Sequence, residues 1–188
     1  MFTKNEIRDL TISILVLTLV FSSFRFEIFL TTLFIVIIAF ASHEILGHKL
    51  VAQHYGCEAE YKMWPLGLLL GLITALIPGG FVIAAPGAVY ISPYKRGFAF
   101  KVSHLTNKQY AIISLAGPLI NIIIAVSLFL VKSFIYPLEL FAMTARISFF
   151  LAFFNLLPIP PMDGSKIMSW NLRIWLIVTT IAFIGLFI

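Results

Sequence analysis

The sequence Ser-His-Glu-Ile-Leu-Gly-His, residues 42–48, closes a long apolar run over residues 28–41 and stands immediately before Lys49. Two imidazoles and a carboxylate are costly in lipid, so ionisable side chains inside a membrane segment indicate a functional site. Histidines beside a glutamate are typical of zinc hydrolase helices, where the glutamate can take a proton from metal-bound water. The stretch therefore predicts metal binding by His43 and His48, with Glu44 as a base.

The spacing of the two histidines differs by one residue from the usual H-E-x-x-H pattern. Residues five apart are separated by about 140° around an ideal α-helix, against about 40° for residues four apart. A wide turn of π type would bring both imidazoles to one face, and Gly47 would ease it. The alternative is that Glu44 and His48, which are four apart, share a face, and that Glu44 is itself a ligand.

The composition is that of an integral membrane protein built of helices. Of the 188 residues, 61% are hydrophobic and 11% charged, and the mean hydropathy is +1.04. The apolar runs along the chain are long enough to favour transmembrane helices. The net charge of +5 is explained by Lys and Arg on the cytoplasmic side and does not require a nucleic acid partner. We therefore expect a single all-α polytopic domain over residues 1–188, with about five to six transmembrane helices.

The expected helices cover residues 9–22, 27–54, 109–131, 137–156 and 174–188. The first is expected to be retained, because no cleavage site of small residues follows it. Two short apolar pieces between residues 65 and 90 are broken by Pro and Gly, which predicts a re-entrant or strand-like segment near 78–92. The run Val89-Tyr90-Ile91-Ser92 is strand-like and could offer an edge to an extended peptide.

The positive charges predict a topology. With the Lys-containing segments 49–62 and 95–108 on the cytoplasmic side, the helix over residues 27–54 runs inward. His43, His48 and Asp163 then lie at one depth, near the cytoplasmic side of the cell membrane. Asp163 could supply a third, oxygen ligand and leave a fourth tetrahedral position for water. The plainer alternatives are a polar helix end at the headgroups, and an Asp163 that only caps a helix.

Three motifs resemble those of the site-2 proteases, a family of intramembrane zinc metalloproteases. They are the His-Glu-His helix, Ala116-Gly117-Pro118-Leu119-Ile120-Asn121, and the stretch from Asn155 to Gly164, Asn-Leu-Leu-Pro-Ile-Pro-Pro-Met-Asp-Gly. They occur in the family's order, and the three hydrophobic segments that carry them make up about half of the chain. The resemblance implies that His43, His48 and Asp163 bind Zn²⁺ and that Glu44 is the base. It also implies that Asn121 or Asn155 holds the substrate or polarises its carbonyl; the alternative for each is an interhelical hydrogen bond.

The function expected from these features is hydrolysis of a peptide bond in a membrane-spanning protein, by water that zinc and Glu44 activate. The expected partners are that substrate and the lipid bilayer, with no nucleic acid; the sequence does not define the oligomeric state. The alternative is a catalytically silent relative that binds membrane proteins without cutting them. A metal transporter is weaker, because the chain shows no inverted repeat.

Overall fold

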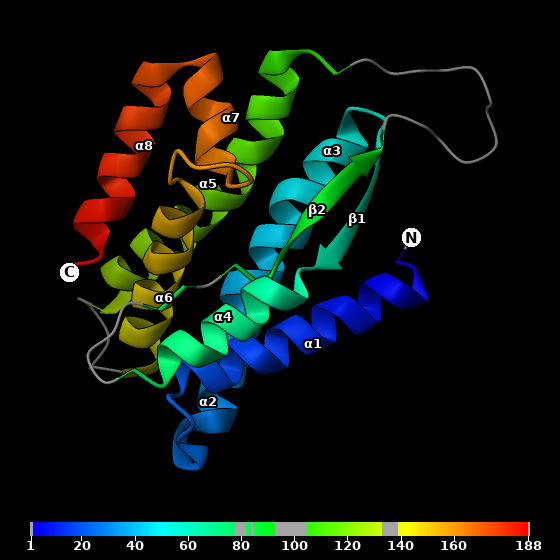
Figure 1. Cartoon of the computed structure of the whole chain (residues 1–188). Helices are drawn as coiled ribbons and strands as arrows, with labels where there is room; N and C mark the ends of the chain where they lie inside the picture. The colour runs from blue at the N-terminus through cyan, green and yellow to red at the C-terminus, as the bar shows by residue number, and fades with distance from the viewer. Residues whose placement is uncertain (1, 78–81, 84, 93–104, 133–138, 188) are drawn as a thin grey trace.

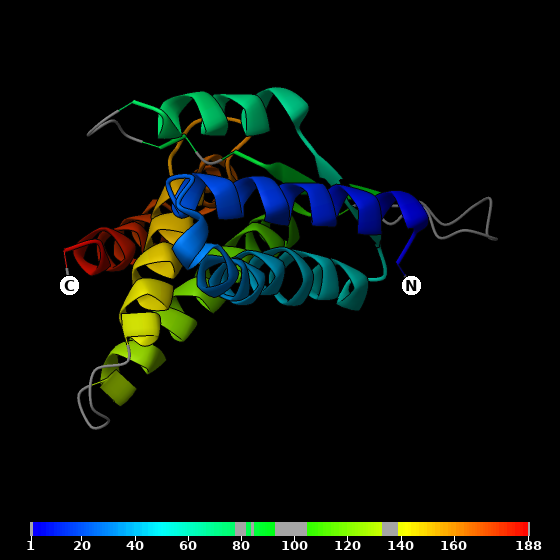
Figure 2. The same cartoon turned by 90° about the horizontal axis from the view of Figure 1, so that it is seen from below.

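The computed structural model describes residues 2–77, 82–83, 85–92, 105–132 and 139–187, and Figure 1 shows the chain. The two ends of the chain lie on opposite sides of the molecule in both Figure 1 and Figure 2. In chain order the elements are α1 (Lys4–Phe21), η1 (Phe26–Ile28), α2 (Phe29–Val36), η2 (Ile37–Lys49), α3 (Leu50–His54), β1 (Glu58–Met63), α4 (Pro65–Ala75), β2 (Gly87–Ser92), α5 (Asn107–Lys132), α6 (Glu139–Asn155), α7 (Asp163–Trp170) and α8 (Leu172–Gly185).

The helices expected over residues 9–22, 27–54, 109–131, 137–156 and 174–188 are all present, with bounds that differ by a few residues at most of their ends. Among the described residues, Phe26–His54 and Asn107–Val131 are long and apolar enough to cross a membrane. The expected number of five to six spans stays a prediction, and so does the single-domain assignment. The Pro-Gly-Gly break at residues 78–80 lies outside the described residues.

The fold is mostly helical, as expected, and the chain also forms a two-stranded antiparallel sheet. β1 and β2 pair in the register Tyr61 to Val89. The strand-like character expected near residues 89–92 is confirmed by β2, whereas β1 lies in the segment 49–62, which was expected only to face the cytoplasm. Alternation explains β1: Ala59 and Tyr61 are buried, while Glu58, Glu60 and Lys62, which alternate with them, are not. β1 is short and rich in charged residues, so it was not recognised as a strand, although one of its faces is buried.

The helices pack in two groups around the sheet and the long central helix α5. One core lies between α1, α2, η2, β1 and α6, and includes the edge-to-face pair Phe40 and Tyr61. A second core joins α5, α6, α7 and α8. In Figure 2, α1 lies between α4 on one side and α2 on the other, and it packs against both. This arrangement puts η2, the helix of the His-Glu-His stretch, between α1 and α5.

A helix at Asp163 was expected only in the alternative in which Asp163 caps it. In the structure Asp163 is instead the first residue of α7, and Met162 occupies the N-cap position. The Pro residues end α6 and cannot continue it, and α7 starts once they have passed. Gly164 allows a close approach here, since a Cβ on it would collide with the Leu156 carbonyl at the end of α6. Asp163 is thereby held beside the end of α6.

Candidate metal centre

The two histidines meet because the helix that carries them is a π-helix. η2 covers Ile37–Lys49, and its backbone bonds close over five residues instead of four. Residues five apart therefore stack on one face, and the His43 and His48 Nε2 atoms lie 3.1 Å apart. The π-type turn expected from the sequence is present. Because it places both imidazoles together, the spacing does not force Glu44 into the ligand set.

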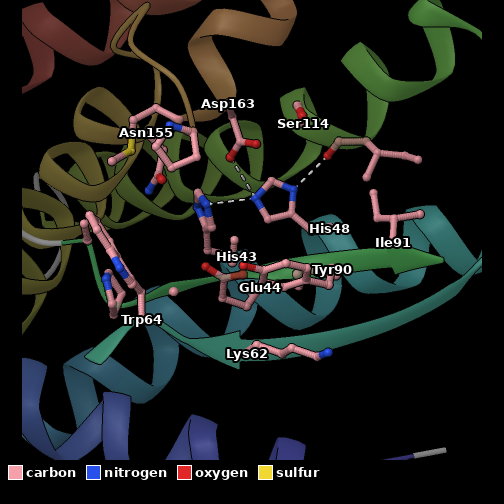
Figure 3. Close-up of a pocket in the computed structure, with 18 of the residues that line it drawn as sticks. His43, Glu44, His48, Lys62, Trp64, Tyr90, Ile91, Ser114, Asn155 and Asp163 are labelled. Carbon is pink, nitrogen blue, oxygen red and sulfur yellow. Dashed lines mark hydrogen bonds and ion pairs between the residues drawn. The ribbon is translucent and has the colours of Figure 1, made fainter. Parts of the chain in front are cut away.

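Asp163 completes the group from the other side. Its Oδ2 lies 3.0 Å from His48 Nε2, and one ligand atom from each of the three residues falls within 4.8 Å of the others. Figure 3 shows the three side chains pointing toward one another from η2 and α7. The Nζ of Lys166, one turn further along α7, donates to Asp163 Oδ1 at 3.2 Å. Lys166 thus holds one carboxylate oxygen and leaves the other facing the histidines.

The donor set fits a zinc ion. His48 Nδ1 is 2.8 Å from the Ile113 carbonyl oxygen, which can only accept, so Nδ1 carries the proton and Nε2 offers its lone pair. Two ligand atoms on a tetrahedral zinc, at about 2.0–2.1 Å from the metal, lie roughly 3.3 Å apart. The observed separations of 3.1 and 3.0 Å are close to that value. Two buried imidazole nitrogens that face each other and a carboxylate are the arrangement a cation stabilises.

Asn121 contacts the other histidine. Its side-chain amide nitrogen lies 3.1 Å from His43 Nδ1, and its Oδ1 has no hydrogen-bond partner among the described residues. Half a turn of the amide exchanges the two atoms, so that Oδ1 accepts from a protonated Nδ1. In that orientation Oδ1 is satisfied and His43 Nε2 is free to bind metal. Asn121 is fully buried and is not among the residues that line the cavity described below.

A close helix contact brings α5 up to the histidines. A Cβ on Gly47 would lie 2.5 Å from Gly117 Cα, so the two glycines let the backbones of η2 and α5 touch. A Cβ on Gly117 would in turn lie 2.7 Å from His43 Nε2. Only glycine fits between the helix and the two rings. Gly117 belongs to one of the three sequence motifs, but its role could not be predicted. Gly47 and the two histidine rings, which require a glycine at this position, are about 70 residues away in the chain.

Glu44 and Asn155 face a cavity of about 230 Å³ beside the three donors. Glu44 is 4% exposed, and its Oε2 has no partner among the described residues. Asn155 uses its Nδ2 to donate to the Leu151 carbonyl at 2.9 Å, which leaves its Oδ1 to the cavity. One wall is the segment 85–91, which contains most of β2 (Figure 3). The cavity therefore joins a metal site, a buried carboxylate and a strand.

The other two histidines of the chain were not predicted to belong to the site. His54 is exposed at the end of α3, and its ring lies edge-to-face with that of Tyr55. His104 lies outside the described residues. Sequence reasoning missed Lys166 and the Ile113 carbonyl. The spacing of Lys166 from Asp163, three residues on one helix, was a usable signal, whereas a backbone carbonyl leaves none.

Comparison with known proteins gives the class of protein. The family model described as peptidase family M50 matches residues 132–176. A protein of Methanocaldococcus jannaschii, provisionally named a zinc metalloprotease, is 41% identical over 185 residues, covering 94% of this chain and 90% of the relative. A Bacillus subtilis protein with the same provisional name is 32% identical over 149 residues, covering 71% of this chain and 65% of the relative. No solved structure matches the chain.

The chain belongs to peptidase family M50, the site-2 proteases. The resemblance seen in the three sequence motifs is therefore confirmed. Zinc is the cofactor that the family and the His/His/Asp group support. The family and the two long apolar helices indicate a membrane-associated, zinc-dependent protease.

Proposed function

We propose that this protein is a multi-pass intramembrane endopeptidase that hydrolyses a peptide bond in a membrane-spanning substrate. The observation that carries the proposal is the convergence of His43, His48 and Asp163 beside Glu44. The two histidines and Glu44 lie in a helix that is apolar enough to span a membrane. Zinc bound by these three side chains would supply Lewis-acid chemistry, which activates water and polarises a carbonyl at neutral pH. The chain itself supplies the base, the substrate groove and the exclusion of bulk water.

Glu44 is the proposed general base. Its carboxylate is buried beside the ligands without being one of them, and its free Oε2 can accept a proton from the attacking water. The water oxygen then bonds to the scissile carbonyl carbon. The carbon–nitrogen bond breaks as Glu44 passes the proton to the leaving amine. The products are a carboxylic acid and an amine, and Glu44 returns to its starting state.

β2 is the strand to which the substrate is proposed to pair. The Tyr61 and Met63 N–H groups of β1 point away from β2, toward side chains of α1. In an antiparallel pair the residues opposite them, Val89 and Gly87, also point their backbone groups outward. Ile91, two residues after Val89, points the same way, so Val89 and Ile91 direct N–H and C=O toward the edge that does not pair with β1. That strand lines the cavity beside the metal donors. A substrate helix, once locally unwound, would pair there and place its backbone near Glu44.

Asn155 is the proposed partner of the scissile carbonyl or the neighbouring substrate backbone. Its amide lines the cavity on the side of α6, opposite the strand. Asn121 is proposed to act on the metal side, through His43, because it is buried behind that ring. The sequence left the two asparagines equivalent, and their positions support different roles.

The test is Glu44→Gln, which keeps the size of the side chain and removes the base. Loss of a general base costs about 10²–10⁴-fold in rate, while zinc content should stay at the wild-type level because the ligands are untouched. Cleavage of a membrane-spanning substrate in liposomes, with metal analysis of the same samples, measures both. Glu139→Gln, at the exposed start of α6, is the matched control and should cut normally. Loss of zinc together with activity would instead make Glu44 a ligand.

The catalytically silent alternative rested on the five-residue spacing. Because the imidazoles meet at 3.1 Å, the spacing no longer argues for it. A wild-type protein that holds zinc, binds membrane proteins and cuts none of the helical substrates offered would favour that alternative over the endopeptidase.

The proposed orientation puts the active site toward the cytoplasmic side of the cell membrane. It follows from the positive charges around residues 49–62 and 95–108. Lys108→Cys, in a Cys57→Ser background, places one thiol at the exposed start of α5. A membrane-impermeant thiol reagent should label it only from the cytoplasmic side, and labelling from outside alone would reverse the topology.

A further inference from the structure

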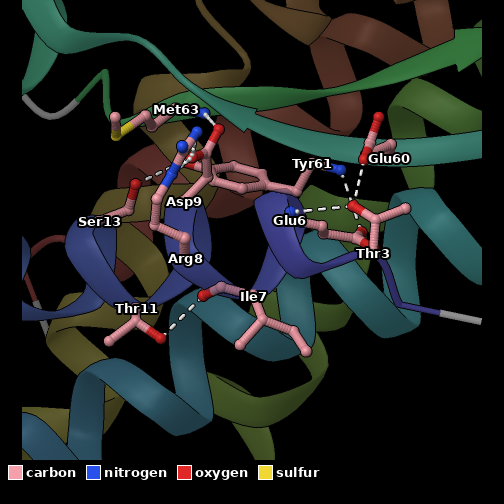
Figure 4. Close-up of polar contacts among 10 residues, drawn as sticks. All are labelled: Thr3, Glu6, Ile7, Arg8, Asp9, Thr11, Ser13, Glu60, Tyr61 and Met63. Atoms are coloured by element: carbon pink, nitrogen blue, oxygen red, sulfur yellow. Dashed lines mark hydrogen bonds and ion pairs between the residues drawn. The ribbon is translucent and has the colours of Figure 1, made fainter.

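Two buried carboxylates of α1 bind the outer edge of β1. Glu6 Oε1 accepts from the Tyr61 N–H at 3.1 Å, and Asp9 Oδ2 accepts from the Met63 N–H at 3.3 Å (Figure 4). Glu6 is 1% exposed and Asp9 7%. The two amides are alternate residues of one strand edge, and both carboxylates are spaced to meet them. The edge of β1 that does not pair with β2 is therefore occupied by side chains.

The N-terminus of α1 adds a second attachment to the same strand. Thr3 caps α1 by accepting from the Glu6 N–H at 3.1 Å, and its hydroxyl donates to Glu60 of β1. Further along, Ser13 and the Tyr61 hydroxyl share a hydrogen bond of 2.8 Å. α1 thus contacts β1 along its length through polar groups that are directional, unlike the apolar contacts around them.

Glu6 also reaches the helix that carries the metal donors. Its Oε2 pairs with the Nζ of Lys49, the last residue of η2 and the neighbour of His48. Both side chains are buried, at 1% and 3% exposure. One carboxylate therefore binds β1 with one oxygen and η2 with the other. A buried charge that loses its partner is strongly disfavoured, so this contact permits little movement of the strand against the helix.

These contacts determine the position of β2, the strand to which the substrate is proposed to pair. β2 pairs with β1, β1 is bound to Glu6, and Glu6 is bound to Lys49 beside His48. We propose that Glu6 is a positioning residue. It fixes the register and the distance between the metal-binding side chains and the free edge of β2, which is the edge that does not pair with β1. The inference rests on the proposed function, in which that edge pairs with the substrate. Through this linkage Glu6 sets which peptide bond reaches Glu44.

The proposal predicts a particular error when the linkage is broken. A substrate strand that slips by one residue would turn its side chains to the opposite face, whereas a slip of two keeps each face. Two residues move the chain by about 6.6 Å along the strand. A loosened sheet should therefore give a second cleavage site two residues from the first, together with a higher KM and a smaller change in kcat.

The main variant is the neutral pair Glu6→Gln with Lys49→Met. It keeps an oxygen for the Tyr61 N–H, removes the contact to η2 and leaves no unpaired charge. Glu6→Asp is the second variant: it keeps the charge but is one methylene too short to reach both partners. Lys4→Gln is the control. Lys4 is exposed at the start of α1 and takes no part in the contacts described above, so its loss should change little.

Three measurements are made on each full-length protein in lipid. Spin labels at Leu50→Cys on α3 and Tyr90→Cys on β2, both exposed, report the distance between helix and sheet in a Cys57→Ser background. Zinc content is measured on the same protein. The cut positions and the kinetic constants are measured on unlabelled protein with a membrane-spanning substrate.

The expected result is a broader label distance and a second cut two residues away in both Glu6 variants, with zinc content unchanged and Lys4→Gln like the wild type. An unchanged distance and an unchanged cut position would overturn the role of Glu6. Loss of zinc in the neutral pair would also overturn it, since the contact would then support the metal helix and not the strand. A wild type that cuts no substrate contradicts the proposed function, while the label distances still decide whether Glu6 positions the sheet.

Discussion

Gly117→Ala should destroy the metal site by a single methyl group. A Cβ on Gly117 would lie 2.6 Å from His48 Cε1, where carbon atoms ordinarily approach to about 3.5 Å. The ring would have to retreat by about 0.9 Å. It cannot do so freely, because His48 is bonded to the Ile113 carbonyl and His43 to Asn121, both on the same helix as Gly117. The methyl group and the bonds that hold the rings come from one rigid element.

The size of that displacement sets the expected loss of zinc. Ligand distances in a metal site are held to about 0.2 Å, so a shift of about 0.9 Å takes His48 out of the site. Loss of an outer-shell partner alone typically costs 10–100-fold in metal affinity, and a displaced ligand should cost about 100-fold or more. Competition with a chromogenic chelator measures the affinity of the purified protein.

Gly185→Ala is the matched control. Its Cβ would collide with the ring of Phe149, far from the metal donors, so both variants overpack the interior. Overpacking typically costs about 1–3 kcal/mol of stability. Both variants should therefore unfold more easily, and only Gly117→Ala should lose zinc. Wild-type zinc affinity in Gly117→Ala would refute the reasoning, and equal loss in the two variants would show that it is general destabilisation.

Three further outcomes are expected. Metal analysis should find zinc lost in His43→Ala and retained in His54→Ala, because only the first removes a donor of the group. Ile91→Pro deletes an N–H on the free edge of β2, where proline is tolerated; KM should rise about tenfold with the zinc content unchanged, and an unchanged KM would exclude pairing there. Tyr61→Phe leaves the Ser13 hydroxyl buried without its partner, so unfolding in detergent should show a loss of about 1–2 kcal/mol, most of it recovered when Ser13→Ala is added.

Much of the fold could be predicted from hydropathy and chain-breaking residues. The long helices follow from apolar runs and the Pro and Gly that end them, and these are local properties of the sequence. α4 begins at Pro65, and proline is favoured at the first position of a helix. β1 could not be predicted, because its charged residues alternate with only two buried ones. Its buried face forms only against other elements, including η2 and α1, which supply Phe40 and Ser13.

The chemistry of the site could also be predicted from the sequence, because it depends on the types of the residues. Histidine, glutamate and aspartate are the residue types that supply the ligands and the base of zinc hydrolases, which made His43, His48, Glu44 and Asp163 candidates. Whether they meet was not readable. The five-residue spacing allowed two faces, and the choice depends on the backbone of η2, whose π form is packed against α5 through Gly47 and Gly117.

The sequence by itself predicted a helical membrane protein that resembles the site-2 proteases, with candidate zinc ligands and a candidate base, since composition and motif are properties of single segments. Only the tertiary structure decided the parts that need two segments at once. The partners of His43 and His48 come from α5, the wall of the cavity from β2, and the anchor of the sheet from Glu6 on α1. These contacts join residues 43 to 78 positions apart, and packing at that range leaves no pattern in the chain.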